Sequence, residues 1–157
     1  MIMRELRFTT QVRGAAQSVF DLVADMPNYG LWLPDSSAFG GTVNVTPYPV
    51  QLGTTYLDSG PIEKPGVVTE FDPPRCIGFH HTVQIRQSIL NTDVDAKIRY
   101  TFESTEDGTF VDRRLTLTFD LRGAWRLALP VLVHGFRKEN DRTLAALKRY
   151  VDASSGE

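Results

Sequence analysis

Hydrophobic and polar residues alternate along most of this chain, and the pattern predicts a protein built mainly from β-strands. The first alternating run covers residues 5–13. Six further strand-like runs follow, at residues 39–46, 53–59, 66–72, 76–86, 93–103 and 109–121. Prolines, glycines and a Glu-Asp-Gly turn at residues 106–108 separate these runs. Because the connections are short, we expect successive strands to pair antiparallel as a meander.

Three parts of the chain have helical spacing instead. Residues 15–24 predict a short amphipathic helix, and residues 28–34, bounded by prolines, predict a second short helix or turn. From Ala124 onward, apolar positions recur at helical spacing and predict a long helix of about 25 residues, even if Pro130 kinks its first turns. Such a helix spans about 35–40 Å.

The order of these elements predicts an α+β fold. We expect a curved, seven-stranded antiparallel sheet wrapped around the long C-terminal helix, with the two short helices after the first strand, as one domain over residues 1–157. A helix covers a stripe only about 10 Å wide, so the sheet curves away on both sides of it. We therefore expect an apolar cavity between sheet and helix, unless large side chains fill it.

Composition narrows the class of protein. The 157 residues carry a formal charge of −2, with 41% hydrophobic and 23% charged residues, which excludes a disordered chain, a fibre and a coiled coil. This charge gives no electrostatic reason to expect nucleic acid or an anionic membrane as the main partner, and the longest apolar run, at residues 127–133, is too short for stable membrane insertion. The single cysteine, Cys76, allows no internal disulfide, and no apolar targeting segment begins the chain. We expect a cytoplasmic protein, and its oligomeric state stays open.

Five segments resemble a known family. They are VRGAAQSVFDLVADMPNYGLWLP, GTTY, VVTEFDPPRCIGFH, DGTFVDRRLTLTF and LALPVLVHGFRKENDRTLAALKRYV. Together they are similar to the START/polyketide cyclase-like (SRPBCC) superfamily, over nearly the whole chain. The resemblance implies the helix-grip fold and a pocket for lipids, sterols, polyketides or hormones, and some relatives are aromatase/cyclases. It transfers no catalytic residue.

Signatures of common catalytic sites are absent from the sequence. It contains no GxGxxG, GxxxxGK[ST], GxSxG or HExxH motif and no CxxC pair. The adjacent His80 and His81 point to opposite faces of a strand, so they cannot readily share a metal ion. We expect neither a metal nor a cofactor.

Two polar residues on the inner strand face are candidates for catalysis. His81 shares its face with Phe79 and Val83, and it is either an acid/base group in the pocket or a buried neutral histidine bonded to a neighbour. Arg113 aligns with Val111 and Leu115. It either anchors a carboxylate, phenolate or carbonyl of a ligand, or extends to solvent or to an acid such as Asp58 or Glu103.

Other side chains are candidates for ligand binding. Asn140 interrupts the apolar stripe of the long helix, so its amide bonds either a ligand or the protein itself. Tyr56 and Asp58 share one strand face, and Asp58 is a possible base only if that face is the inner one. The expected aromatic lining, which could equally be plain core, is Tyr29, Trp32, Tyr100, Phe102, Phe119 and Phe136. Tyr29 and Trp32 are expected at the mouth of the pocket.

Three functions fit these patterns. The first is binding of a small hydrophobic molecule, lipid or polyketide-like, between the sheet and the C-terminal helix. The second is a polyketide cyclase/dehydratase in which His81 and Arg113 move protons, assisted by Tyr100 or Asp58. The third is protein interaction through the outer sheet face, whose charged residues suit solubility better than a tight interface.

Overall fold

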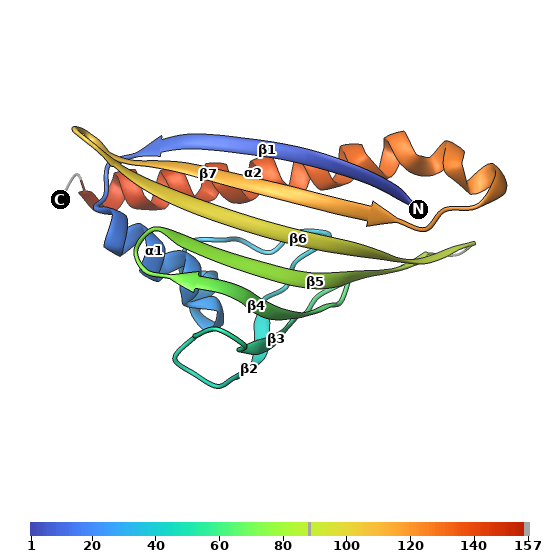
Figure 1. Cartoon of the computed structure of the whole chain (residues 1–157), viewed down its shortest axis with the longest axis horizontal. Helices are drawn as coiled ribbons and strands as arrows, with labels where there is room; N and C mark the ends of the chain where they lie inside the picture. The colour runs from blue at the N-terminus through green and yellow to red at the C-terminus, as the bar shows by residue number, and fades with distance from the viewer. Residues whose placement is uncertain (88, 156–157) are drawn as a thin grey trace.

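The computed structural model describes residues 1–87 and 89–155. Its sheet has seven antiparallel strands in the order β1-β7-β6-β5-β4-β3-β2, and Figure 1 shows the C-terminal helix lying lengthwise along it. This is the helix-grip arrangement that the sequence predicted. The strands are β1 (Ile2–Val12), β2 (Thr42–Thr46), β3 (Thr55–Asp58), β4 (Lys64–Asp72), β5 (Cys76–Gln87), β6 (Leu90–Thr105) and β7 (Gly108–Phe119).

The helices also follow the predicted order. A short α-helix, α1 (Ala16–Ala24), leads into the 3-10 helix η1 (Met26–Leu31). A second 3-10 helix, η2 (Gly123–Ala128), precedes the long helix α2 (Leu129–Ser155). The long helix was expected from Ala124, but its α-helical part begins five residues later. Pro130 explains this start, because proline lacks an N–H and is best tolerated in the first turn of a helix.

The strand predicted at residues 39–46 begins late. Phe39 lies in a loop, and β2 starts only at Thr42. Gly40 and Gly41 cause the break, since Gly41 has a φ of +113° and the Gly40 N–H donates to the Ser59 carbonyl at 2.8 Å. As a result, residues 32–41 form a long loop that crosses from η1 to the sheet.

The core fills only one end of the space between the sheet and α2. All the buried residues of α2 lie from Asn140 onward: Asn140, Thr143, Leu144, Ala146, Leu147 and Val151. There α1 completes the packing, with the Phe20 ring 5.4 Å from that of Phe71. The N-terminal half of α2 is largely exposed, and Val131 keeps 73% of its surface accessible. The sheet beneath that half is therefore left incompletely covered.

The outer face of the sheet carries charges that pair with one another. Arg86 contacts Asp93 at 2.7 Å, and Arg99 contacts Glu70 at 2.8 Å. His80 also points outward and pairs with Asp95, so the two adjacent histidines occupy opposite faces as predicted. Such exposed pairs contribute little to stability, typically about 0–1 kcal/mol each.

Candidate functional site

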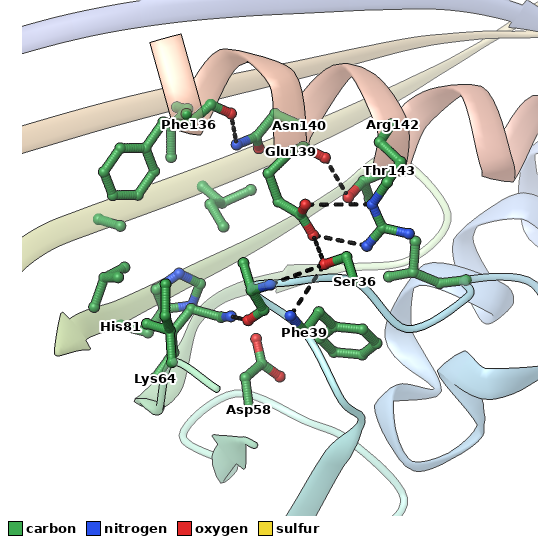
Figure 2. Close-up of a pocket in the computed structure, with 18 of the residues that line it drawn as sticks. Ser36, Phe39, Asp58, Lys64, His81, Phe136, Glu139, Asn140, Arg142 and Thr143 are labelled. Atoms are coloured by element: carbon green, nitrogen blue, oxygen red, sulfur yellow. Dashed lines mark hydrogen bonds and ion pairs between the residues drawn. The ribbon is translucent and has the colours of Figure 1, made fainter. Parts of the chain in front are cut away.

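A cavity of about 680 Å³ lies between the sheet and the N-terminal half of α2. Strands β3 to β7 form one wall, α2 forms the opposite wall, and the segment from Met26 to Phe39 closes one side. Figure 2 shows polar side chains projecting into this space from both walls. The predicted hollow beneath the helix is therefore present, and side chains do not fill it.

The floor of the cavity is mainly apolar because strand side chains alternate in direction. The inward positions of three neighbouring strands supply it: Phe79, Val83 and Ile85 of β5, Ala96, Ile98 and Tyr100 of β6, and Arg113 and Leu115 of β7. Only the last of these strands places a charged group among them. Contact with this floor favours a ligand with a large apolar surface.

Tyr56 and His81 meet across a glycine. Tyr56 pairs with Gly66 in the β3–β4 register, and Gly66 pairs with His81 in the β4–β5 register. The Tyr56 hydroxyl and the His81 Nδ1 atom are 3.1 Å apart. A Cβ atom on Gly66 would lie only 2.5 Å from Cζ of Tyr56 and 2.7 Å from Cβ of His81. The missing side chain therefore lets the tyrosine cross an intervening strand.

His81 is held in its neutral form. Burial, reinforced by the positive charges of Lys64 and Arg113, lowers the pKa of His81 to about 3. A histidine with so low a pKa is a weak base at neutral pH, and it carries no proton to donate as imidazolium. In the free protein its role is that of a neutral hydrogen-bonding group on the cavity wall.

Arg113 joins the sheet to α2 across the cavity. Its Nε donates to Oδ1 of Asn140 at 2.8 Å, and its Nη1 donates to the Tyr100 hydroxyl. The guanidinium carbon lies 4.9 Å from the centroid of the Tyr100 ring. Among the described residues no carboxylate forms an ion pair with it, so neither Asp58 nor Glu103 is its partner. A positive charge without an ion-pair partner thus faces a mainly apolar space.

Asp58 and Lys64 form a second polar group on the sheet side of the cavity. They are directly opposite each other in the β3–β4 register. Oδ1 of Asp58 accepts a hydrogen bond from Thr42 Oγ1 at 2.6 Å, and Nζ of Lys64 donates to the Ala38 carbonyl at 2.6 Å. Burial raises the pKa of Asp58 and lowers the pKa of Lys64, so it shifts each group toward its neutral form.

The loop at residues 34–39 is fastened to α2 along one side of the cavity. Ser36 Oγ donates to Oε1 of Glu139 at 2.9 Å, and Arg142 Nη1 donates to the Pro34 carbonyl at 2.6 Å. Burial alone would raise the pKa of Glu139, but the hydrogen bonds from Arg142 and Ser36 outweigh it and hold that pKa below its usual value. With the Lys64 bond to Ala38, these contacts tie the loop to both walls.

The structure places almost all of the predicted site residues around one cavity. They are His81, Arg113, Tyr29, Trp32, Tyr56, Asp58, Tyr100, Phe136 and Asn140. The face that carries Tyr56 and Asp58 is the inner one, as the base hypothesis required. Tyr29 and Trp32 lie together, with ring centroids 5.1 Å apart, and the Tyr29 hydroxyl donates to the Val23 carbonyl.

Phe119 is placed differently from the other predicted site residues. Its side chain is on the predicted inner face, but it does not line the cavity. It is 1% exposed and packs against Phe136, with ring centroids 6.0 Å apart, so it supports the lining from behind. Phe102 is likewise core, where it stacks on Tyr100 at 5.8 Å and meets Phe20 at 5.7 Å.

Sequence reasoning missed several residues of the site. Lys64, Ser36, Glu139 and Arg142 line the cavity, and Gly66 makes room for the Tyr56–His81 contact. Glu139 and Arg142 carried a usable signal, since they flank Asn140 on the predicted helix within one turn. Within residues 1–87 and 89–155, no three histidine, cysteine or acidic side chains gather closely enough to hold a metal ion.

Comparison with solved structures identifies the fold. An uncharacterized protein from Rhizobium leguminosarum superposes with a TM-score of 0.68 at 12% identity, covering 97% of this chain and 96% of that one. The di-domain ARO/CYC StfQ from the steffimycin biosynthetic pathway gives 0.69 at 15% identity, covering 99% of this chain and 52% of that one. DynU16, from the dynemicin biosynthetic locus, gives 0.62 at 14% identity, covering 96% and 48%.

The remaining findings concern the helices and the relatives of the sequence. No curated protein matches the chain significantly. In the part of the chain that the structure describes, none of the helices combines the length and apolar character needed to cross a bilayer. A family model described as "Polyketide cyclase / dehydrase and lipid transport" matches residues 3–152. The match spans the sheet, the cavity and nearly all of α2, and the chain therefore belongs to the polyketide cyclase/dehydrase and lipid transport family.

Proposed function

We propose that this protein binds a small, mainly hydrophobic molecule, a lipid or a polyketide-like compound, in the cavity beneath α2. The observation that carries the proposal is the 680 Å³ hollow, with an apolar floor and a few convergent polar groups. Ligand pockets typically have volumes of roughly 300–1,000 Å³ and this kind of lining. The size suits a fatty acyl chain or a few fused rings.

Arg113 favours a ligand that carries a polar oxygen atom. A guanidinium that faces an apolar space without an ion-pair partner is costly, and a bound oxygen acceptor would reduce that cost. A carboxylate, phenolate or carbonyl oxygen placed beside Arg113 could accept a hydrogen bond from it. The proposal is therefore an amphipathic ligand, with its oxygen at Arg113 and its apolar part on Ile98 and Val83.

Gly135 offers a matched pair of variants for the test. It lies in α2 and lines the cavity, and a Cβ built on it meets no atom within 4 Å. We propose to titrate the fluorescent fatty acid parinaric acid into the wild type, Gly135→Ala and Gly135→Trp. Saturable binding should persist in Gly135→Ala and fall at least about tenfold, or about 1.4 kcal/mol, in Gly135→Trp. Equal binding by both variants would contradict the proposed location.

A cyclase or dehydratase reaction is the second candidate. The observation that favours it is the side-by-side placement of Arg113 and the Tyr100 hydroxyl, because both can donate to a carbonyl or enolate oxygen. StfQ, whose name contains ARO/CYC, shares the fold. His81 is a weaker candidate as the base than its position suggested, since its pKa is about 3.

The reaction hypothesis has a direct test. Arg113→Ala and His81→Ala should each abolish turnover of a candidate poly-β-ketone while far-UV circular dichroism shows an intact fold. Turnover that survives both substitutions would exclude this mechanism. Loss in Arg113→Ala alone would assign oxyanion stabilisation to the arginine and leave His81 a structural role.

A further inference from the structure

Lys64 is an amine on the wall of a mainly apolar cavity. It projects from the first residue of β4, is half-buried, and lies near Asp58 and His81 in Figure 2. Its Nζ atom donates to the Ala38 carbonyl at 2.6 Å and lies 5.9 Å from the centroid of the Phe39 ring. Across the described residues no carboxylate pairs with this ammonium group. The ammonium group of Lys64 therefore has no ion-pair partner among these residues.

Charged groups face Lys64 from three elements. Asp58 of β3 and Glu139 of α2 favour its charged form, whereas Arg142 of α2 and Arg113 of β7 oppose it. Burial is the largest influence, and the pKa of Lys64 falls below its ordinary value. A lower pKa leaves more of the amine unprotonated at neutral pH, and the unprotonated amine is the nucleophile.

We propose that Lys64 captures a carbonyl-bearing ligand, an aldehyde or a ketone, as a Schiff base. The amine nitrogen attacks the carbonyl carbon, a C–N bond forms, and the oxygen takes a proton to give a carbinolamine. The C–O bond then breaks and water leaves, so the ligand and the lysine amine yield an imine plus one water. The step needs no oxidant or reductant. It rests on the proposed function, because the ligand must first enter the cavity.

Asp58 is placed to assist the loss of water. It is the direct cross-strand neighbour of Lys64, and such residues have Cβ atoms about 4.5–5.5 Å apart. Burial raises the pKa of its carboxyl group, so Asp58 keeps a proton over a wider pH range than an exposed aspartate. A protonated Asp58 can donate to the departing oxygen of the carbinolamine.

The other three lysines are internal controls. Lys97 is exposed on the outer face of the sheet, and Lys148 is exposed and paired with Asp152 at 2.9 Å. Lys138 borders the same cavity as Lys64, but it is exposed on α2. If a reagent labels lysines only because they border the cavity, Lys138 should be labelled as fast as Lys64. If burial of the amine sets the labelling rate, Lys64 alone should be labelled fast.

The test is reductive trapping with 6-methoxy-2-naphthaldehyde, a flat apolar aldehyde. The full-length protein is incubated with the aldehyde and sodium cyanoborohydride near pH 7, and the labelled lysines are identified by peptide mass mapping. Burial lowers the pKa of Lys64 and so enlarges its unprotonated fraction, and Lys64 should therefore be labelled several-fold faster than the exposed Lys138. Lys64→Met should abolish this fast phase, and Lys97→Met should leave it unchanged.

Two readouts separate this proposal from the binding proposal. Labelling of Lys64 no faster than that of Lys138 in the wild type would overturn capture by Lys64, whatever the variants do. Binding of the matching alcohol, 6-methoxy-2-naphthalenemethanol, is measured separately by fluorescence on the wild type. If the alcohol binds and Lys64 is not preferentially labelled, the cavity binds ligands without covalent capture. If neither occurs, both proposals fail.

Discussion

The hydroxyl of Tyr56 lies 3.1 Å from Nδ1 of His81, although a whole strand separates their two strands in the sheet. The contact passes over Gly66, where any side chain would occupy the space of the tyrosine ring. It fixes the orientation of two polar groups on the cavity wall without help from the helix. The positions of these two polar groups are thus set by the sheet itself.

Gly66→Ala should damage both the fold and the site. The added Cβ would meet a ring and a buried histidine at 2.5 to 2.7 Å, so Tyr56 must move and lose His81. Overpacking of this kind costs about 1–3 kcal/mol, measured as the free energy of unfolding in urea. Gly135→Ala is the matched control, because its Cβ meets open space and a helix gains up to about 1 kcal/mol from the change. Equal stability of the two variants would show that Tyr56 and His81 do not pack tightly over Gly66.

His81 should make the protein less stable in mild acid. The pKa of His81 is about 3 in the folded state and 6.5 in an unfolded chain. Between these values only the unfolded state binds the proton, so stability falls as pH drops below about 6.5, by up to about 1.4 kcal/mol per unit. Measured by urea unfolding, the free energy of unfolding of His81→Gln should fall less between pH 7 and pH 4.5 than that of the wild type. An imidazole NMR titration that places the His81 midpoint near 6.5 would refute the account.

Asn140→Asp should weaken ligand binding without unfolding the protein. The new carboxylate would neutralise Arg113, whose Nε now donates to the Asn140 amide oxygen at 2.8 Å. Attraction to Arg113 offsets the lost donation from the amide to the Phe136 carbonyl. Affinity for parinaric acid, whose carboxylate needs a free cation, should fall about tenfold or more. Asp141→Ala, on an exposed position of the same helix, is the control, and unchanged affinity in Asn140→Asp would remove Arg113 from the site.

Ser36→Ala should loosen the loop that closes the cavity. Ser36 Oγ donates to Glu139 and accepts bonds from the N–H groups of Ala38 and Phe39, each at 3.1 Å. Their loss should speed hydrogen exchange in residues 36–39 and raise both the association and dissociation rates of the ligand. Ser37→Ala, at the neighbouring position, is the comparison. Identical exchange rates in the wild type and Ser36→Ala would show that other contacts close the loop.

The fold was predictable because its signals are periodic. Alternation in residues 93–103 and helical spacing after Ala124 each repeat over many residues, so small errors at the ends do not change the topology. The hollow was predictable for a geometric reason, since one helix covers less width than a seven-stranded sheet offers. The faces of His81 and Arg113 were also assigned correctly, and both side chains point inward, whereas the face that carries Tyr56 had been left open.

The position of a residue along a face was not predictable in the same way. Phe119 shares the inner face with Leu115, yet it lies beyond the cavity, behind Phe136. Alternation specifies the side of the sheet and says nothing about which part α2 covers closely. Lys64 and Gly66 were missed because their importance depends on the register of three strands, which the turns and bulges set. The loop at residues 34–39 was missed because Phe39 has the side chain of a strand residue. The two glycines that follow it break the strand, which begins only at Thr42.

The most direct test of the account is where a ligand touches the protein. The chain has six isoleucines, of which Ile62, Ile85 and Ile98 line the cavity and Ile2, Ile77 and Ile89 do not. Their δ1-methyl groups can be followed by NMR during titration with parinaric acid. Ligand binding in the cavity predicts saturable shifts at the first three methyls and unmoved signals at Ile2 and Ile77. Saturable shifts at Ile2 or Ile77, with the three lining methyls unmoved, would contradict it.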